Sequence, residues 1–218
     1  MKGAREGPRP AAVTFDVDGT LYDAGRQQIR LWRAFLRHPR ILGGWPEVFA
    51  SLRGERHDDL WAEAGRRLSA RVGGRPEDAE AVVRAVLLER WPQTFHPGLL
   101  FSGIHEALAA LDAWGIPRAV VSDYPSRAKL RALGVGEGWS AVIDCSALGA
   151  LKPLPDGLEA AAAALGVPAS AIVHIGDRAD TDGGAAEAAG AVALIRGRDY
   201  PDEGALVGAL ESLFSEDA

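Results

Sequence analysis

The chain has 218 residues, of which 47% are hydrophobic and 25% are charged, and its formal net charge at pH 7 is -6. This composition indicates an ordinary globular protein with one full core and room for a small second domain, and it excludes a disordered or fibrous chain. The negative charge argues against a nucleic-acid partner, because binding to a phosphate backbone normally needs a basic surface.

The sequence carries no sign of a membrane or secreted protein. The first ten residues, MKGAREGPRP, lack the apolar core of a signal peptide, and no window approaches the roughly 18 apolar residues of a membrane span. We therefore expect a cytoplasmic protein with no membrane partner, either a monomer or a homodimer. Cys145 is the single cysteine, so no intramolecular disulfide can form, and we expect a buried free thiol.

The first predicted element is a buried strand at residues 11–17, AAVTFDV, which stops at the turn signal Asp18-Gly19. Residues 22–95 then change to a helical pattern, with helices predicted at RQQIRLWRAFLR, HDDLWAEAGRRLSARV and PEDAEAVVRAVLLERW. Glycines near positions 43 and 73 predict breaks between these helices. The first helix places four apolar residues at helical spacing: Ile29, Trp32, Phe35 and Leu36. We expect the four tryptophans of this segment to build its own small core: Trp32, Trp45, Trp61 and Trp91.

From residue 96 onward, predicted strands and helices alternate. The strands are RAVVSD, AVIDC, AIVHIGD and AVALIRG, and the helices are GIHEALAALDAWG, SRAKLRALG, DGLEAAAAALG and TDGGAAEAAG. Such alternation indicates crossover units and a parallel sheet covered by helices on both faces. The predicted fold class is therefore α/β: a doubly wound, Rossmann-like core (residues 1–21 and 96–218) with an inserted α-helical domain (residues 22–95).

Polar residues follow the ends of the predicted strands, where doubly wound sheets bind their ligands. Carboxylates hold a hard cation such as Mg²⁺, whereas hydroxyl and ammonium groups hold phosphate oxygens. Since the chain has only three lysines among 24 Lys and Arg residues, a lysine in the loop LKPLP favours a role for its compact charge. Six residues make up this predicted phosphate and metal site: Asp16, Asp18, Ser122, Asp123, Lys152 and Asp177.

Four motifs in a characteristic order resemble those of the haloacid dehalogenase-like (HAD) hydrolase superfamily, in the subgroup with a helical cap inserted after the first motif. They are DVDGT (residues 16–20), VVSD (residues 120–123), Lys152 in KPLP, and GDRADTD (residues 176–182). The resemblance covers nearly the whole chain and implies that residues 22–95 form the cap. It also implies an enzyme that uses Mg²⁺ to hydrolyse a small phosphorylated metabolite through an aspartyl-phosphate intermediate.

The resemblance implies a role for each motif residue. Asp16 would be the nucleophile, and Asp18 would be the general acid and base, which the dehalogenases of the superfamily lack. The ligands of Mg²⁺ would be Asp16, the backbone carbonyl of Asp18, and Asp177. Asp182 would orient a ligand water or Lys152. The residues that would bind the phosphate group are Ser122, Lys152, Gly19 and Thr20.

Two features of the sequence leave alternatives open. Asp123 stands where related proteins usually have Asn, so we expect it to turn away from the phosphate and bond backbone or a cap residue; a positively charged substrate is the alternative. Five arginines also share one side of the first cap helix, and they are either a solvated face or, nearest the hinge, in reach of the substrate: Arg26, Arg30, Arg33, Arg37 and Arg40.

The function also has two alternatives. A sugar-phosphate mutase would use the same aspartyl phosphate but protect it from water, and a binding module would have the fold without useful turnover. Intact Asp16, Asp18, Lys152 and Asp177 weigh against the binding module. We expect His174, within the strand IVHIG, to be a core residue. The substrate itself is not indicated, because the variable cap chooses it.

Overall fold

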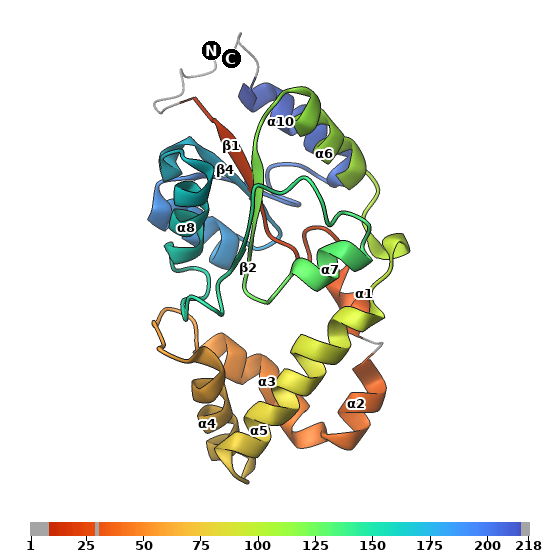
Figure 1. The fold of residues 1–218 in the computed structure, drawn as a ribbon, viewed down its shortest axis with the longest axis vertical. Helices are drawn as coiled ribbons and strands as arrows, with labels where there is room; N and C mark the ends of the chain where they lie inside the picture. The colour runs from red at the N-terminus through yellow and green to blue at the C-terminus, as the bar shows by residue number, and fades with distance from the viewer. Residues whose placement is uncertain (1–8, 29–30, 215–218) are drawn as a thin grey trace.

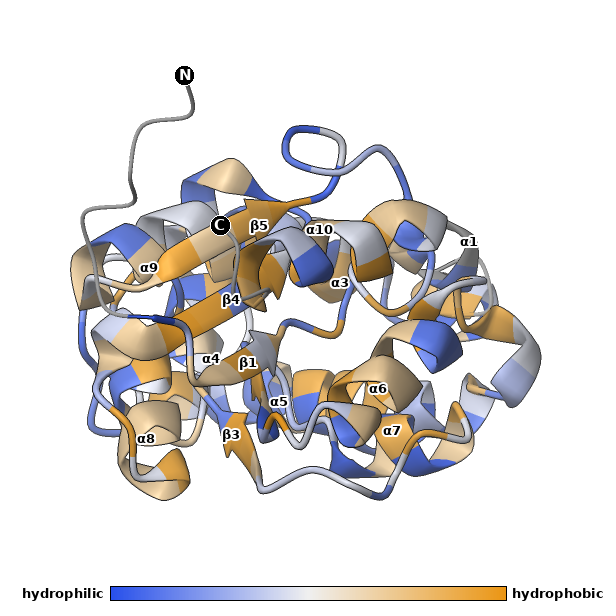
Figure 2. Ribbon diagram, turned by 90° about the horizontal axis from the view of Figure 1, so that it is seen from above, coloured by the Kyte–Doolittle hydropathy of each residue, from blue (hydrophilic) through white to orange (hydrophobic). Residues whose placement is uncertain are grey.

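The structure, a computed structural model, describes residues 9–28 and 31–214. At its centre is a five-stranded parallel sheet in the order β3-β2-β1-β4-β5. Helices α8 and α9 lie on one side of the sheet and α6 and α10 on the other (Figure 2). The strands are β1 (Ala12–Phe15), β2 (Arg118–Ser122), β3 (Ala141–Asp144), β4 (Ile172–Gly176) and β5 (Val192–Ile195). The predicted doubly wound α/β fold is confirmed.

The central strand β1 explains why the motif residues gather at one edge. Val13 pairs with Arg118 of β2 and with Val173 of β4, so all three strands run in the same direction. Every residue of β1, β2 and β4 is buried, as expected for parallel strands covered on both faces. The polar residues that follow these strands therefore meet beyond their carboxyl ends.

The helices that cover the sheet are α6 (Ile104–Ala113), α7 (Arg127–Ala132), α8 (Asp156–Leu165), α9 (Gly184–Ala189) and α10 (Leu206–Phe214), of which α10 was not predicted. Helix α8 packs very closely on the sheet, since a Cβ at Gly157 would lie 2.6 Å from Sγ of Cys145. Cys145 is completely buried as a free thiol, as predicted. No helix in the described part of the chain is long and apolar enough to cross a bilayer.

Between β1 and α6 the chain forms a helical lobe beyond the carboxyl ends of the strands (Figure 1). Its helices are α1 (Ala24–Gln28), α2 (Trp32–Arg37), α3 (Pro39–Ser51), α4 (Leu60–Val72) and α5 (Pro76–Val83), and residues 84–94 continue α5 as a wider π-helical segment and a 3-10 turn. The predicted break at Gly73 is confirmed, because this residue ends α4 with a φ of 82°.

The predicted break near position 43 is wrong. Helix α3 runs through Gly43 and Gly44 and even contains Pro46. Gly44 is buried against α4, where a Cβ would lie 3.4 Å from a side-chain carbon of Val72. Close packing of two helices therefore outweighs the weak helix propensity of glycine at this position.

The tryptophan core of the lobe is only partly as expected. Trp45, Trp61 and Trp91 are buried, and the rings of Trp45 and Trp61 stack with centroids 5.9 Å apart. Trp32 is 54% exposed, so the expectation that it belongs to this core is wrong. The reason is that α2 turns Ala34, on another side of the helix, toward the core.

The apolar stripe of the first predicted helix is likewise not buried where the structure describes it, and its first residue, Ile29, lies outside the described residues. Phe35 and Leu36 remain 47% and 69% exposed. Of the arginine stripe, Arg33, Arg37 and Arg40 are exposed, as for a solvated face. Arg30 and the side chain of Arg26 lie outside the described residues.

Candidate active site

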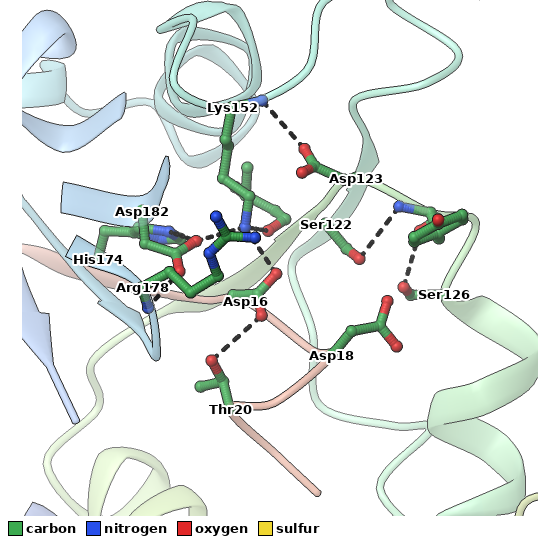
Figure 3. Close-up of polar contacts among 12 residues, drawn as sticks. Asp16, Asp18, Thr20, Ser122, Asp123, Ser126, Lys152, His174, Arg178 and Asp182 are labelled. Carbon is green, nitrogen blue, oxygen red and sulfur yellow. Dashed lines mark hydrogen bonds and ion pairs between the residues drawn. The ribbon is translucent and has the colours of Figure 1, made fainter. Parts of the chain in front are cut away.

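A buried lysine links two of the motif carboxylates. Asp16 follows β1, and Lys152 reaches it from the loop after β3 (Figure 3). Nζ of Lys152 donates to Oδ1 of Asp16 at 2.6 Å and to Oδ1 of Asp182 at 2.5 Å. Burial lowers the pKa of Lys152, but Asp16 and Asp182 raise it by more, so it lies well above its ordinary value. Lys152 is therefore a permanent ammonium between two carboxylates.

Asp177 completes a group of three carboxylates. One oxygen each of Asp16, Asp177 and Asp182 lies within 4.8 Å of the other two. Burial raises the pKa of Asp16 to about 8 against the opposing effect of Lys152, and burial raises the pKa of Asp177 to about 6. Ionisation of Asp16 and Asp177 is therefore unfavourable unless a further positive charge lies close by. Hard oxygen ligands in such a group fit a divalent cation such as Mg²⁺, which would favour their ionised forms.

Two glycines of the motifs make room for these carboxylates. Gly19 has a φ of 103°, and a Cβ there would overlap Oδ2 of Asp177. A Cβ at Gly176 would overlap the side chain of Asp182. Thr20, next to Gly19, donates its hydroxyl to Oδ2 of Asp16 at 3.1 Å. The glycines of the DGT and GD sequences therefore leave space for the side chains of Asp177 and Asp182. The threonine of DGT orients Asp16.

Asp18 faces a second buried lysine. Nζ of Lys129, on α7, donates to both carboxylate oxygens of Asp18, at 2.6 and 2.7 Å, and the hydroxyl of Tyr22 donates to Oδ1. Burial lowers the pKa of Lys129, with Asp18 acting in the opposite direction. Three aromatic rings surround this ammonium, with centroids 3.9, 5.1 and 5.8 Å from Nζ: Trp91, Tyr124 and Phe95.

Asp123 turns away from the group of three carboxylates, as expected. Its Oδ1 accepts from the backbone N–H of Lys152 at 3.0 Å, and its Oδ2 pairs with Nη1 of Arg53 at 2.7 Å. Arg53 comes from the loop between α3 and α4 and also donates to the carbonyl of Lys152. The aspartate therefore bonds both backbone and a residue of the helical lobe.

Ser122 and His174 are buried beside the carboxylates. Ser122 ends β2, and its Oγ accepts from the backbone N–H of Tyr124 at 3.4 Å. His174 is a buried residue, as predicted, and burial lowers its pKa. Its Nε2 also lies 3.4 Å from Oδ1 of Asp182, a contact that the strand pattern did not predict.

The carboxylates and Lys152 line the floor of a cleft of about 350 Å³ between the sheet and the helical lobe. The core side supplies Asp16, Asp18, Lys152 and the carboxylates after β4. Residues of α3 and the following loop form the opposite wall: Trp45, Pro46, Phe49 and Arg53. An acidic floor with a fixed ammonium and room for one small group suits a phosphate bound together with a divalent cation.

The sequence profile of the haloacid dehalogenase-like hydrolase family matches residues 10–190. This chain is a haloacid dehalogenase-like hydrolase. It is 30% identical to the N-acetylmuramic acid 6-phosphate phosphatase of Pseudomonas aeruginosa, over 78% of this chain and 74% of that protein. It is also 30% identical to the phosphoglycolate phosphatase of Rhodospirillum rubrum, over 89% and 82%. A β-phosphoglucomutase structure from Clostridium difficile shares the fold, with a TM-score of 0.73 at 15% identity over 95% and 98% of the two chains.

Sequence reasoning missed several residues at this HAD hydrolase's candidate site. Lys129 could have been found by the argument used for Lys152, because both belong to the only three lysines in the chain. Tyr124 follows the motif VVSD directly, and its ring now lies between α3 and Lys129. Nothing in the sequence distinguishes Arg53 from the other arginines of the helical segment, which is rich in this residue.

Proposed function

We propose that this hydrolase is a Mg²⁺-dependent phosphatase that hydrolyses a small phosphomonoester through an aspartyl phosphate on Asp16. The observation that carries the proposal is the Lys152 ammonium held between Asp16 and Asp182 in a cleft that Asp177 also lines. Both relatives named above are phosphatases, which supports the same reaction class. Residues 22–95 would act as the cap over a core of residues 1–21 and 96–218.

Charge is the main obstacle to this reaction. A carboxylate that approaches a phosphate dianion meets like charge, at roughly 4 kcal/mol for each unit pair at about 4 Å in an effective dielectric of about 20. Lys152 places one fixed positive charge 2.6 Å from the attacking carboxylate. Mg²⁺, held by Asp16, Asp177 and the backbone carbonyl of Asp18, would supply further positive charge against the phosphate oxygens. Asp182 would keep Lys152 in place.

The proton transfers are assigned to Asp18. As an Asp16 oxygen bonds to phosphorus, the bond to the leaving oxygen breaks and Asp18 gives that oxygen a proton. Asp18 then takes a proton from a water molecule that attacks phosphorus, and the bond to Asp16 breaks to release phosphate. Ser122 and Thr20 would orient the phosphate oxygens and the nucleophile, with Gly19 leaving space beside them.

The first prediction concerns the metal. Purified protein treated with a chelator should release no phosphate from a panel of phosphomonoesters, and added Mg²⁺ should restore the release, because the acidic group needs a cation. Phosphate is measured colorimetrically.

Asp16→Asn should abolish turnover while urea unfolding stays cooperative, since the amide keeps the side-chain volume.

The alternatives give different results in the same assay. Activity that is indifferent to chelation would contradict the mechanism, as would a fully active Asp16→Asn variant. Interconversion of sugar-phosphate isomers without release of phosphate would support the mutase. A protein that turns over no member of the panel, with or without metal, would support the binding module.

A further inference from the structure

A second, larger hollow adjoins the catalytic cleft. It has a volume of about 740 Å³, against about 350 Å³ for the cleft with the carboxylates. The two hollows share part of their walls: Trp45, Pro46, Trp91 and Tyr124. A group bound at the catalytic carboxylates could therefore extend along these rings into the second hollow.

The lining of this hollow is almost entirely apolar. Among the described residues that line it none has a charged side chain, and the hydroxyl of Tyr124 already accepts from Nε1 of Trp45 at 2.9 Å. Helix α2 contributes Trp32, Phe35 and Leu36, the three large apolar side chains that are 54%, 47% and 69% exposed. Exposed apolar side chains gathered around a concave surface are typical of a binding site.

We infer that this hollow binds the apolar, non-reacting part of the substrate, which would be the phosphate ester of a bulky aryl or medium-chain alkyl alcohol. The inference rests on the proposed phosphatase function and adds the substrate class to it. The volume falls within the range of small-molecule sites, and the hollow shares four lining residues with the cleft where the phosphate would bind. A highly polar substrate would leave its hydroxyl or carboxylate groups unpaired against these walls.

The first test uses the wild-type chain with Mg²⁺ and a series of n-alkyl phosphates from methyl to octyl. We expect kcat/KM to rise roughly fourfold for each methylene that enters the hollow, until it is filled. Glycerol phosphate and phosphoglycolate, which are small and polar, should be poorer substrates than hexyl phosphate. A flat or falling alkyl series, with measurable activity on every member, would overturn the inference and leave the proposed phosphatase intact.

The second test alters the wall of the hollow. Trp32→Ser should lower the ratio of kcat/KM for octyl phosphate to that for methyl phosphate by on the order of tenfold, because the alkyl chain loses an apolar contact. Trp114→Ser is the matched control, since Trp114 is 39% exposed at the end of α6 and lines neither hollow. The control should leave the ratio unchanged. Equal ratios in the wild type and both variants would overturn the inference.

The same proteins also show whether α2 packs against a second copy of the chain. In that case the wild type would elute as a dimer, Trp32→Ser would dissociate it, and the alkyl ratio would not change, which would overturn the inference.

If no phosphomonoester is hydrolysed at all, the proposed function fails, and the inference is decided by calorimetry of naphthyl phosphate with the wild type and Trp32→Ser. Weaker binding by the variant supports the inference, and equal binding contradicts it.

Discussion

Asp16 and Asp18 are two residues apart, yet each has its own lysine partner. Asp16 pairs with Lys152 at 2.6 Å and Asp18 with Lys129 at 2.6 Å. In a chain with 24 Lys and Arg residues, two of the three lysines therefore lie at the candidate site. A lysine ammonium is a compact charge that can sit beside one carboxylate, whereas the planar fork of arginine needs more space. Separate cations suit the roles proposed above, in which Asp16 is the nucleophile and Asp18 the proton-transfer group.

Lys129 should matter for proton transfer to the leaving group. Lys129→Met keeps the aliphatic volume among the aromatic rings but removes the ammonium that holds both oxygens of Asp18. We expect kcat on an alkyl phosphate to fall on the order of 10- to 100-fold, because a misplaced catalytic group loses much of its effect. The loss on 4-nitrophenyl phosphate should be smaller, because its leaving group barely needs a proton.

Two further variants give the largest expected loss and an unaffected control, with which the result for Lys129→Met can be compared. Asp18→Asn removes the proposed proton-transfer group itself and sets the largest expected loss, about 100- to 10,000-fold. Arg127→Met removes an exposed cation from the start of the same helix, α7, and should change neither substrate's kcat. Equal losses for Lys129→Met on both substrates in single-turnover experiments would show that Lys129 does not act through Asp18.

The sequence predicted the carboxylates of the candidate site better than their partners. Asp16 and Asp177 could be placed at one edge because each follows an apolar strand of a parallel sheet, and such strands end together. The pairing of Asp18 with Lys129 joins residues 111 positions apart. It depends on how α7 packs against the aromatic rings of the helical lobe, which no local pattern encodes.

At the scale of elements, sequence periodicity predicted the strands and the core helices well. It predicted the helices of the lobe less well. Gly43 and Gly44 were interpreted as a break, but α3 continues through them because α4 packs against its glycine side. The same kind of close approach is found in the core at Gly157 of α8. Glycine in this chain therefore marks helix contacts as well as turns, and the sequence alone does not separate the two.

Two glycine-to-alanine changes in helices should have opposite effects on stability. At Gly157 a Cβ would lie 2.6 Å from Sγ of Cys145 and 2.8 Å from Val121, so Gly157→Ala should destabilise the fold by about 1–3 kcal/mol. At Gly208, within α10, nothing lies within 4 Å of the added Cβ, so Gly208→Ala should stabilise by about 0.5–1 kcal/mol. Urea unfolding measures both free energies, and destabilisation by the two alike would contradict the packing argument.

At the scale of the whole molecule, one loop ties the helical lobe to the sheet domain. Between α3 and α4, Arg53 pairs with Asp123, Arg56 pairs with Asp156 at 2.8 Å, and the backbone N–H of His57 donates to the carbonyl of Gly149 at 2.8 Å. The first pair is mostly shielded from solvent, with side chains 18% and 10% exposed, while Arg56 is 63% exposed. The shielded pair should therefore contribute more to keeping the cleft closed.

Asp123→Asn tests that difference. The amide can still accept from the backbone of Lys152 but loses the charge that holds Arg53. If the pair contributes about 1 kcal/mol to closure, hydrogen exchange of the amide of His57 should speed up about fivefold. Asp156→Asn, which breaks the exposed pair of the same loop, should change that exchange much less. A larger effect from Asp156→Asn would assign the closing role to the exposed pair.

The central place of β1 has a consequence for how the chain folds as it is made. This strand is synthesised before the other strands of the sheet, and its two neighbours arrive only with residues 118–122 and 172–176. Contacts within the helical segment between them are much shorter in sequence, and short-range contacts form fastest. On the ribosome the lobe can therefore acquire structure while the apolar strand AVTF still has unpaired edges. Until β4 emerges, the segment that leads into Asp16 keeps unpaired strand edges, which favour aggregation or a need for a chaperone.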